Sequence, residues 1–164
     1  MVDVAIENAA AYAARYGLTL AERLGFGIHG TVHVAEHKVK GDRSAIKAHR
    51  AEIPYLREKS VYRRLKSGHI SDILGFHVPQ LINADDGLRV IEMSIVTRPF
   101  VLDFAGAYLD ASPEFSVEIW AEWESEKREQ FSTRWTEVRK VIDALETLGI
   151  HLVDISPSNI AFLD

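Results

Sequence analysis

The apolar and polar positions divide the chain into a strand-rich first part and a helical second part. An alanine-rich segment, Val4–Tyr16, consists of strong helix formers and ends at Gly17, a residue that often closes a helix. From there to about His49, apolar and polar residues alternate between glycine turns, which predicts strands. We expect a three-stranded antiparallel meander made of residues 18–20, 31–35 and 44–48.

A helix is predicted directly after the meander. Pro54 suits a first helical turn, and Gly68 suits the end of the segment. Between them, the residues that recur at helical spacing are Tyr55, Glu58, Tyr62 and Leu65. One carboxylate therefore lies within an otherwise apolar stripe.

Two more strands and a helical region follow. Residues 80–84 and 88–96 flank the turn 85–87 and predict a hairpin, which would complete a five-stranded antiparallel sheet. Past Pro99 we expect helices, with a variable acidic stretch over residues 112–126 and one long helix running to about Leu148. The apolar stripe of that helix is Phe131, Trp135, Val138, Ile142 and Leu145.

The resulting fold class is α+β, with a first lobe over residues 1–98 and a reduced helical lobe over residues 99–164. The final residues, 151–164, are predicted to form a loop and a short apolar strand. The helical stripe would need a cover in so short a chain. It could be covered by a homodimer or protein partner, or by the N-terminal helix and residues 115–123.

Composition narrows the possible functions. With 164 residues, 47% of them hydrophobic, the chain can bury a sizeable core. Its formal charge of −5 gives no basic excess for nucleic acid, and it contains no cysteine for disulfides or thiolate metal sites. Neither a signal peptide nor a membrane-spanning run is recognisable, so a cytoplasmic location is the default expectation. His33 and His37 share a strand face without an obvious third ligand, which favours solvent-facing residues over a metal site.

Three glycines lie between the first two predicted strands. In the pattern Gly25-x-Gly27-x-x-Gly30-x-Val32 they permit a tight turn and allow backbone N–H groups to approach a phosphate closely. The same triplet matches a dinucleotide-binding fingerprint or a plain hairpin. The dinucleotide reading requires a helix after Gly30, whereas the residues that follow alternate as a strand.

A lysine and a glutamate are predicted to pair. Lys47 lies late in the third strand, and by itself it would be read as an ordinary exposed lysine. Glu58, however, occupies the inward stripe of the next helix, where a carboxylate requires a cation. Glu52 is the rival partner of Lys47, but its position suits the start of a helix, so we favour Glu58.

The loop near the end of the sequence carries a second polar set. Asp154 and Asn159 lie five residues apart around a proline, from where they could reach a bound hydroxyl and Mg²⁺. The alternative is a turn in which both side chains bond to the local backbone. Because the same chain also carries the glycine loop and Lys47, we favour a chemical role for Asp154 and Asn159.

Taken in order, these residues resemble the motifs of the protein kinase-like superfamily, over most of the chain. The resemblance implies that the glycine loop with Val32 covers ATP, and that Lys47 holds its phosphates while paired with Glu58. It further implies a hinge for adenine within residues 92–99, Asp154 as the catalytic base and Asn159 as a Mg²⁺ ligand.

The sequence also departs from the family pattern. Leu152 and Val153 stand where protein kinases usually carry His and Arg, and Ser156 stands where serine/threonine kinases usually carry lysine. No Asp-Phe-Gly segment follows Asn159, so the family's main metal-binding aspartate is expected to be missing; Asp164 is a remote substitute. We therefore interpret the chain as a truncated or degenerate member.

Three functions follow from that interpretation. The first is a kinase-like protein that binds ATP or a related nucleotide and transfers little or no phosphate. The second is a minimal ATP-dependent phosphotransferase that uses Asp154 as its base. The third is an interaction protein that keeps the scaffold without binding nucleotide.

Overall fold

The computed structural model of the chain describes residues 2–164. Its first element is helix α1 (Val4–Tyr16), as the alanine-rich pattern predicts. The side chain of Asp3 caps its start by accepting a hydrogen bond from the N–H of Ala5, and Gly17 ends it in the left-handed conformation, at φ 71°. Ala5, Ala9, Tyr12 and Ala13 form its buried face.

The central sheet has five strands, all paired antiparallel, in the order β1-β2-β3-β7-β6. The strands are β1 (Leu18–Phe26), β2 (Gly30–His37), β3 (Arg43–His49), β6 (Leu81–Asp85) and β7 (Val90–Met93). The expected α+β class and five-stranded antiparallel sheet are thus confirmed. The last predicted strand was too long, because the chain leaves the sheet after Met93. Residues 94–96 line a cavity instead.

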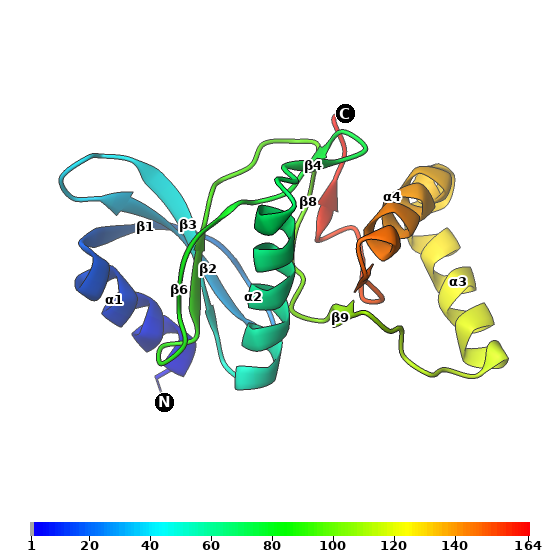
Figure 1. Ribbon diagram of the computed structural model, residues 1–164, viewed down its shortest axis with the longest axis horizontal. Coiled ribbons are helices and arrows are strands. Elements are labelled where there is room, and N and C mark those ends of the chain that lie inside the picture. The colour runs from blue at the N-terminus through cyan, green and yellow to red at the C-terminus, as the bar shows by residue number, and fades with distance from the viewer. Residues whose placement is uncertain (1) are drawn as a thin grey trace.

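Two helices cover opposite faces of this sheet (Figure 1). Alternation along β3 assigns its side chains to the two faces. Ile46 and Ala48 pack in one cluster with α1, whereas Ala45 packs in the other cluster with residues of helix α2 (Glu52–Ser67). Lys47 is in phase with Ala45, so its ammonium lies on the α2 side of the sheet.

A second, four-stranded sheet has the order β11-β8-β5-β4. Its strands are β4 (Asp72–Ile73), β5 (Phe76–His77), β8 (Phe100–Val101) and β11 (Ile160–Ala161). The expectation of helix directly after Pro99 was therefore wrong, because β8 comes first and pairs antiparallel with β11. The short apolar strand predicted near the end of the sequence is β11.

The helical part consists of two helices rather than one. Helix α3 (Val117–Phe131) contains much of the acidic stretch that was expected to be variable, and Ser116 caps its start. A 3₁₀ turn (Ser132–Arg134) separates it from α4 (Trp135–Thr147). Ser132, at φ 52°, interrupts the predicted continuous helix. Strands β9 (Tyr108–Leu109) and β10 (Ile150–His151) pair beside α4.

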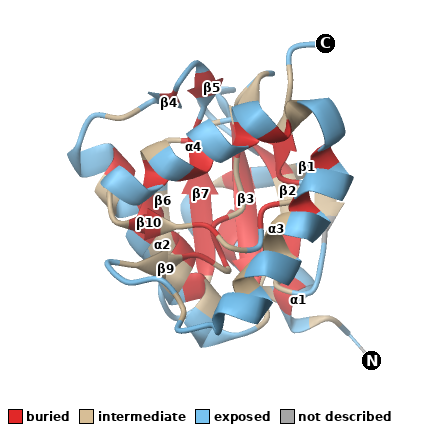
Figure 2. Cartoon of the chain, turned by 90° about the vertical axis from the view of Figure 1, so that its right-hand side faces the viewer, coloured by how far each residue is buried: buried red, intermediate tan, exposed pale blue. Residues whose placement is uncertain are grey.

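The sequence left open what covers the apolar stripe of this helical part, and the structure shows that the stripe is buried within the chain. The exposed fractions of its five residues are 5% or less: Phe131, Trp135, Val138, Ile142 and Leu145. Trp123 of α3 packs edge-on against Trp135, with ring centroids 5.8 Å apart, so part of residues 115–123 does cover the stripe. Helix α1 lies on the far side of the central sheet and does not (Figure 1). The outward faces of α3 and α4 are exposed (Figure 2).

Among the described residues, no helix combines the length and the apolar character that crossing a bilayer would require.

Candidate functional site

A cavity of about 620 Å³ lies between the glycine loop, β3, α2, residues 94–96 and the loop after β10. Its volume is within the range typical of sites for small molecules. Every residue that the sequence analysis selected for a site lines this cavity: Gly25, Gly27, Gly30, Val32, Lys47, Glu58, Asp154 and Asn159. Tertiary structure therefore brings three separate sequence motifs to one place.

The glycine loop joins β1 to β2 and is followed by a strand, so the dinucleotide reading does not fit it. The N–H of Gly27 donates to the carbonyl of Gly30 at 3.0 Å, which closes the turn. Arg50 fixes the loop from behind: its guanidinium donates to the carbonyl of Gly27 and forms an ion pair with Asp3, and its N–H donates to the carbonyl of His29. The loop is thus held at the rim of the cavity.

Replacing Gly30 with alanine is expected to destabilise the protein far more than replacing Gly27. A Cβ atom on Gly30 would lie 1.9 Å from the carbonyl oxygen of Ala48, whereas nothing lies within 4 Å of a Cβ on Gly27. Strands β2 and β3 would have to separate, so we expect Gly30→Ala to lower the free energy of unfolding by about 2 kcal/mol or more. Urea unfolding of the two variants provides the measurement, and equal stabilities would contradict the packing at Gly30.

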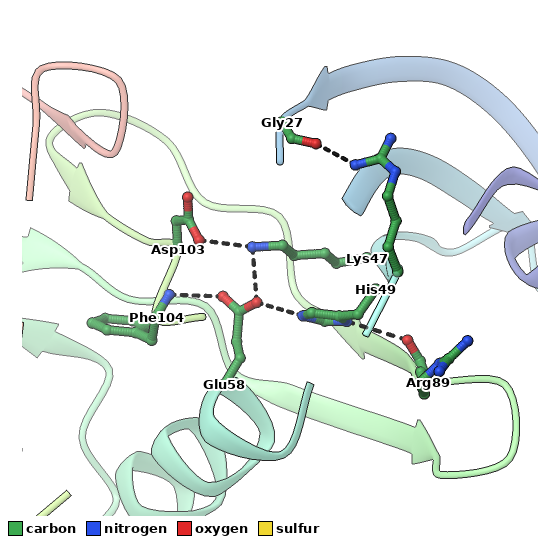
Figure 3. Close-up of polar contacts among 8 residues, drawn as sticks. Gly27, Lys47, His49, Glu58, Arg89, Asp103 and Phe104 are labelled. Atoms are coloured by element: carbon green, nitrogen blue, oxygen red, sulfur yellow. Dashed lines mark hydrogen bonds and ion pairs between the residues drawn. The ribbon is translucent and has the colours of Figure 1, made fainter. Parts of the chain in front are cut away.

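Lys47 and Glu58 form the ion pair that the sequence predicted. Lys47 Nζ lies 2.8 Å from Glu58 Oε1, and both side chains are buried (Figure 3). Complete burial acts to raise the pKa of Glu58, but the charge of Lys47 and a hydrogen bond from His49 outweigh it and lower that pKa to about 2. Glu52, the rival partner, begins α2 and is exposed.

A second carboxylate, which the sequence analysis missed, meets Lys47 from the other side. Asp103 Oδ1 lies 2.8 Å from Lys47 Nζ, and the Asp103 side chain is 37% exposed and lines the cavity. Its backbone has the left-handed φ of 72°, a strained conformation that is common at functional sites. The N–H of the next residue, Phe104, donates to Glu58 Oε2 at 2.8 Å, and its ring packs edge-on against Tyr62.

Pairing of two short strands brings Asp103 to the late loop. Because β8 and β11 are antiparallel, the residues after β8 lie beside those before β11. The N–H of Leu102 accordingly donates to the carbonyl of Asn159 at 2.9 Å. The sequence did carry a signal, since residues 103–106 read Asp-Phe-Ala-Gly. The sequence analysis missed this signal because it looked for an Asp-Phe-Gly segment only after Asn159.

The late loop presents Asp154 and Asn159 to the cavity. The carboxylate of Asp154 lies so close to Gly106 that a Cβ on this glycine would be 2.2 Å from Oδ2. Lost hydration and the negative charge of Asp103 raise the pKa of Asp154. Asn159 is buried, and its Oδ1 accepts a hydrogen bond from the N–H of Ser156 at 2.7 Å, which fixes the orientation of the amide. Asn159 therefore makes the local backbone hydrogen bond that the alternative reading expected, and it also lines the cavity.

Asp164, the remote substitute ligand, does not line the cavity. Its side chain is 83% exposed and forms an ion pair with Arg134. Asp103, in contrast, does line the cavity.

We compared the chain with models of protein families, with curated proteins and with solved structures, and none of them matched.

Proposed function

We propose that the chain binds ATP with Mg²⁺ in this cavity and transfers a phosphoryl group to a hydroxyl acceptor. The observation that carries the proposal is the position of Lys47, whose ammonium lies 2.8 Å from both Glu58 and Asp103 in the cavity beneath the glycine loop. A lysine held by carboxylates at the phosphate end of a nucleotide cavity can contact phosphate oxygens without a large rearrangement. The resemblance to the protein kinase-like superfamily supports the same reading.

The donor set suits Mg²⁺ in the presence of nucleotide. Mg²⁺ prefers oxygen ligands and is commonly held by one or two protein groups together with substrate phosphates and water. Asp103 offers a carboxylate and Asn159 an amide oxygen with a second lone pair. Among residues 2–164, no group of three or more histidine, aspartate or glutamate side chains is arranged to hold a metal by itself. When bound, the ion would neutralise phosphate charge.

The remaining residues have separable tasks in this proposal. The backbone of the glycine loop covers the phosphates, and the apolar side chains of Val32 and Met93 enclose the base. Asp154 accepts the proton of the acceptor hydroxyl, a task that its raised pKa favours because a stronger base accepts a proton more readily. The sequence analysis favoured a protein that transfers little or no phosphate because it found no metal-binding aspartate after Asn159. Asp103 now offers that carboxylate, so we favour transfer over binding alone.

Nucleotide binding is tested by thermal unfolding with ATP, in the presence and absence of Mg²⁺. A ligand at 100 times its dissociation constant stabilises the folded state by about 2.7 kcal/mol, so we expect Tm to rise by about 5–10 °C with Mg²⁺ and by less without it. No shift at millimolar ATP would contradict the proposal and favour an interaction protein.

Asp154→Asn is expected to slow phosphoryl transfer by about 10²–10⁴-fold, because the amide cannot accept the proton. Its thermal shift with Mg²⁺ and ATP should remain as large as that of the wild type, since Asp154 contributes to the transfer step and not to binding. The measurement is transfer of the γ-phosphoryl group of ATP to small alcohols or protein hydroxyls, with ADP as the second product. Equal rates in the two proteins would exclude Asp154 as the base.

A further inference from the structure

His29, a basic residue of the glycine loop, has no role in the phosphoryl transfer described above. It lies between Gly27 and Gly30 and lines the cavity beneath the loop. The residue is exposed, and no hydrogen bond within the described part of the chain engages its imidazole. The ring can therefore contact a bound ligand without first breaking a hydrogen bond to the protein.

The backbone of His29 is held in place by Arg50. The carbonyl of His29 accepts a hydrogen bond from the backbone N–H of Arg50 at 2.9 Å, and the guanidinium of Arg50 donates to the carbonyl of Gly27. Asp3 in turn fixes this guanidinium, with Arg50 Nη2 2.6 Å from Asp3 Oδ2. The loop therefore presents His29 at a defined point of the cavity rim.

His29 lies across the cavity from Asp154, since the glycine loop and the late loop form different parts of the lining. Lost hydration and the negative charge of Asp103 raise the pKa of Asp154, and His29 acts in the opposite direction. The imidazole thus lies within electrostatic range of that carboxylate. In the proposed function, the group between the glycine loop and Asp154 is the γ-phosphoryl group together with the acceptor hydroxyl.

The cavity offers little positive charge for a triphosphate. Among the described residues of its lining there is one ammonium, that of Lys47, and there are three carboxylates: Glu58, Asp103 and Asp154. Lys47 already lies 2.8 Å from two of these carboxylates. Phosphoryl transfer depends on groups that stabilise the charge on the phosphate oxygens, so a further donor is needed at the end of the nucleotide that faces Asp154.

The late loop does not provide a basic side chain for this purpose. Residues 155–158 contain neither lysine nor arginine, and the hydroxyls of Ser156 and Ser158 lie 2.6 Å apart and bond to each other. Besides Lys47, His29 is the one basic residue in the described lining of the cavity.

We propose that His29 is a catalytic residue whose imidazole N–H donates a hydrogen bond to the γ-phosphoryl group of the bound nucleotide. This inference rests on the proposed function and adds a second phosphate-binding side chain to it. Lys47 stays paired with Glu58 and contacts the phosphates nearer the base. An imidazole carries at least one N–H in either neutral tautomer and in its protonated form, so the contact does not depend on the charge of His29.

The hydrogen bond acts on the oxygens that carry the charge of the transferring group. In the transfer step the acceptor oxygen forms a bond to the γ-phosphorus, the bond to the bridging oxygen breaks, ADP leaves, and Asp154 takes the proton of the hydroxyl. His29 forms no covalent bond and gives up no proton. It stabilises the γ-phosphoryl oxygens from the glycine-loop side while the acceptor approaches from the side of Asp154.

A comparison of a triphosphate with a diphosphate tests the contact directly, by calorimetric titration in the presence of Mg²⁺. We expect His29→Ala to bind the non-hydrolysable β,γ-imido analogue of ATP at least about fivefold more weakly than the wild type does. Its affinity for ADP should stay within about twofold, because ADP has no γ-phosphoryl group. An equal change for both ligands, or no change for either, would overturn the inference.

Phosphoryl transfer to small alcohols gives a second measurement. We expect His29→Ala to lower kcat by about 10²-fold, and His29→Gln to recover at least about a tenth of the wild-type rate, because its amide also donates. His33→Ala is the matched control, since His33 of β2 is partly buried and does not line the cavity; its rate should equal that of the wild type. A His29→Gln variant as slow as His29→Ala would contradict the role of a hydrogen-bond donor.

The titrations also separate this inference from the proposed function. His29 is exposed, so its replacement should leave the midpoint of urea unfolding unchanged. If the wild type binds neither nucleotide, the proposed function fails, and the role of His29 fails with it. If the wild type binds both and His29→Ala binds both equally well, only the role of His29 is wrong.

Discussion

The variant Asp103→Asn is expected to lose Mg²⁺-dependent turnover of ATP by about 10²–10³-fold, because a neutral amide replaces the carboxylate that would hold the metal. Asparagine keeps the size of the side chain and tolerates a positive φ, so the strained backbone at Asp103 should persist. Lys47 also retains its partner Glu58. The fold is therefore expected to survive while the Mg²⁺-dependent part of the thermal shift with ATP disappears.

Asp164→Asn is the matched control for this prediction. Asp164 was the substitute ligand considered from the sequence, but it is exposed and paired with Arg134 at the surface. Surface ion pairs contribute little, so turnover and stability should remain close to those of the wild type. Turnover that falls in Asp164→Asn and persists in Asp103→Asn would overturn the assignment of the metal ligand.

The variant Glu58→Gln is expected to lower the free energy of unfolding by about 3–5 kcal/mol at pH 7, because it leaves the buried ammonium of Lys47 without its buried carboxylate. The side chain of Glu58 has no exposed surface and contacts Lys47, His49 and the N–H of Phe104. Urea unfolding provides the measurement. Glu52→Gln, at the exposed start of the same helix, should cost only about 0.3–1 kcal/mol.

The difference between wild type and Glu58→Gln should also depend on pH. Folding lowers the pKa of Glu58 from its usual 4.5 to about 2, so the folded state binds this proton more weakly than the unfolded state. The stabilisation is complete above pH 4.5 and is lost as the pH falls towards 2. A difference that stays constant through this window would contradict the pairing of Glu58.

Sequence patterns predicted correctly those elements that are stabilised by interactions between residues close together in the chain. The alanines of α1 and the stop at Gly17 determine that helix without reference to the rest of the chain. The pairing of Glu58 could also be predicted, because a carboxylate within an apolar stripe requires a cation and Lys47 was the candidate nearby in sequence. The helix break at Ser132 was missed, since the apolar spacing continues through it.

The apolar and polar patterns sufficed to predict the central sheet, the helices α1 and α2 that pack on it, and the residue types that line the cavity. They did not reveal that Asp103 completes the cluster around Lys47, and they left open whether α3 covers the stripe of α4. Both features depend on contacts between segments that are distant in the sequence. The pairing of β8 with β11 sets Asp103 beside Asn159, and two-residue strands leave almost no pattern in a sequence.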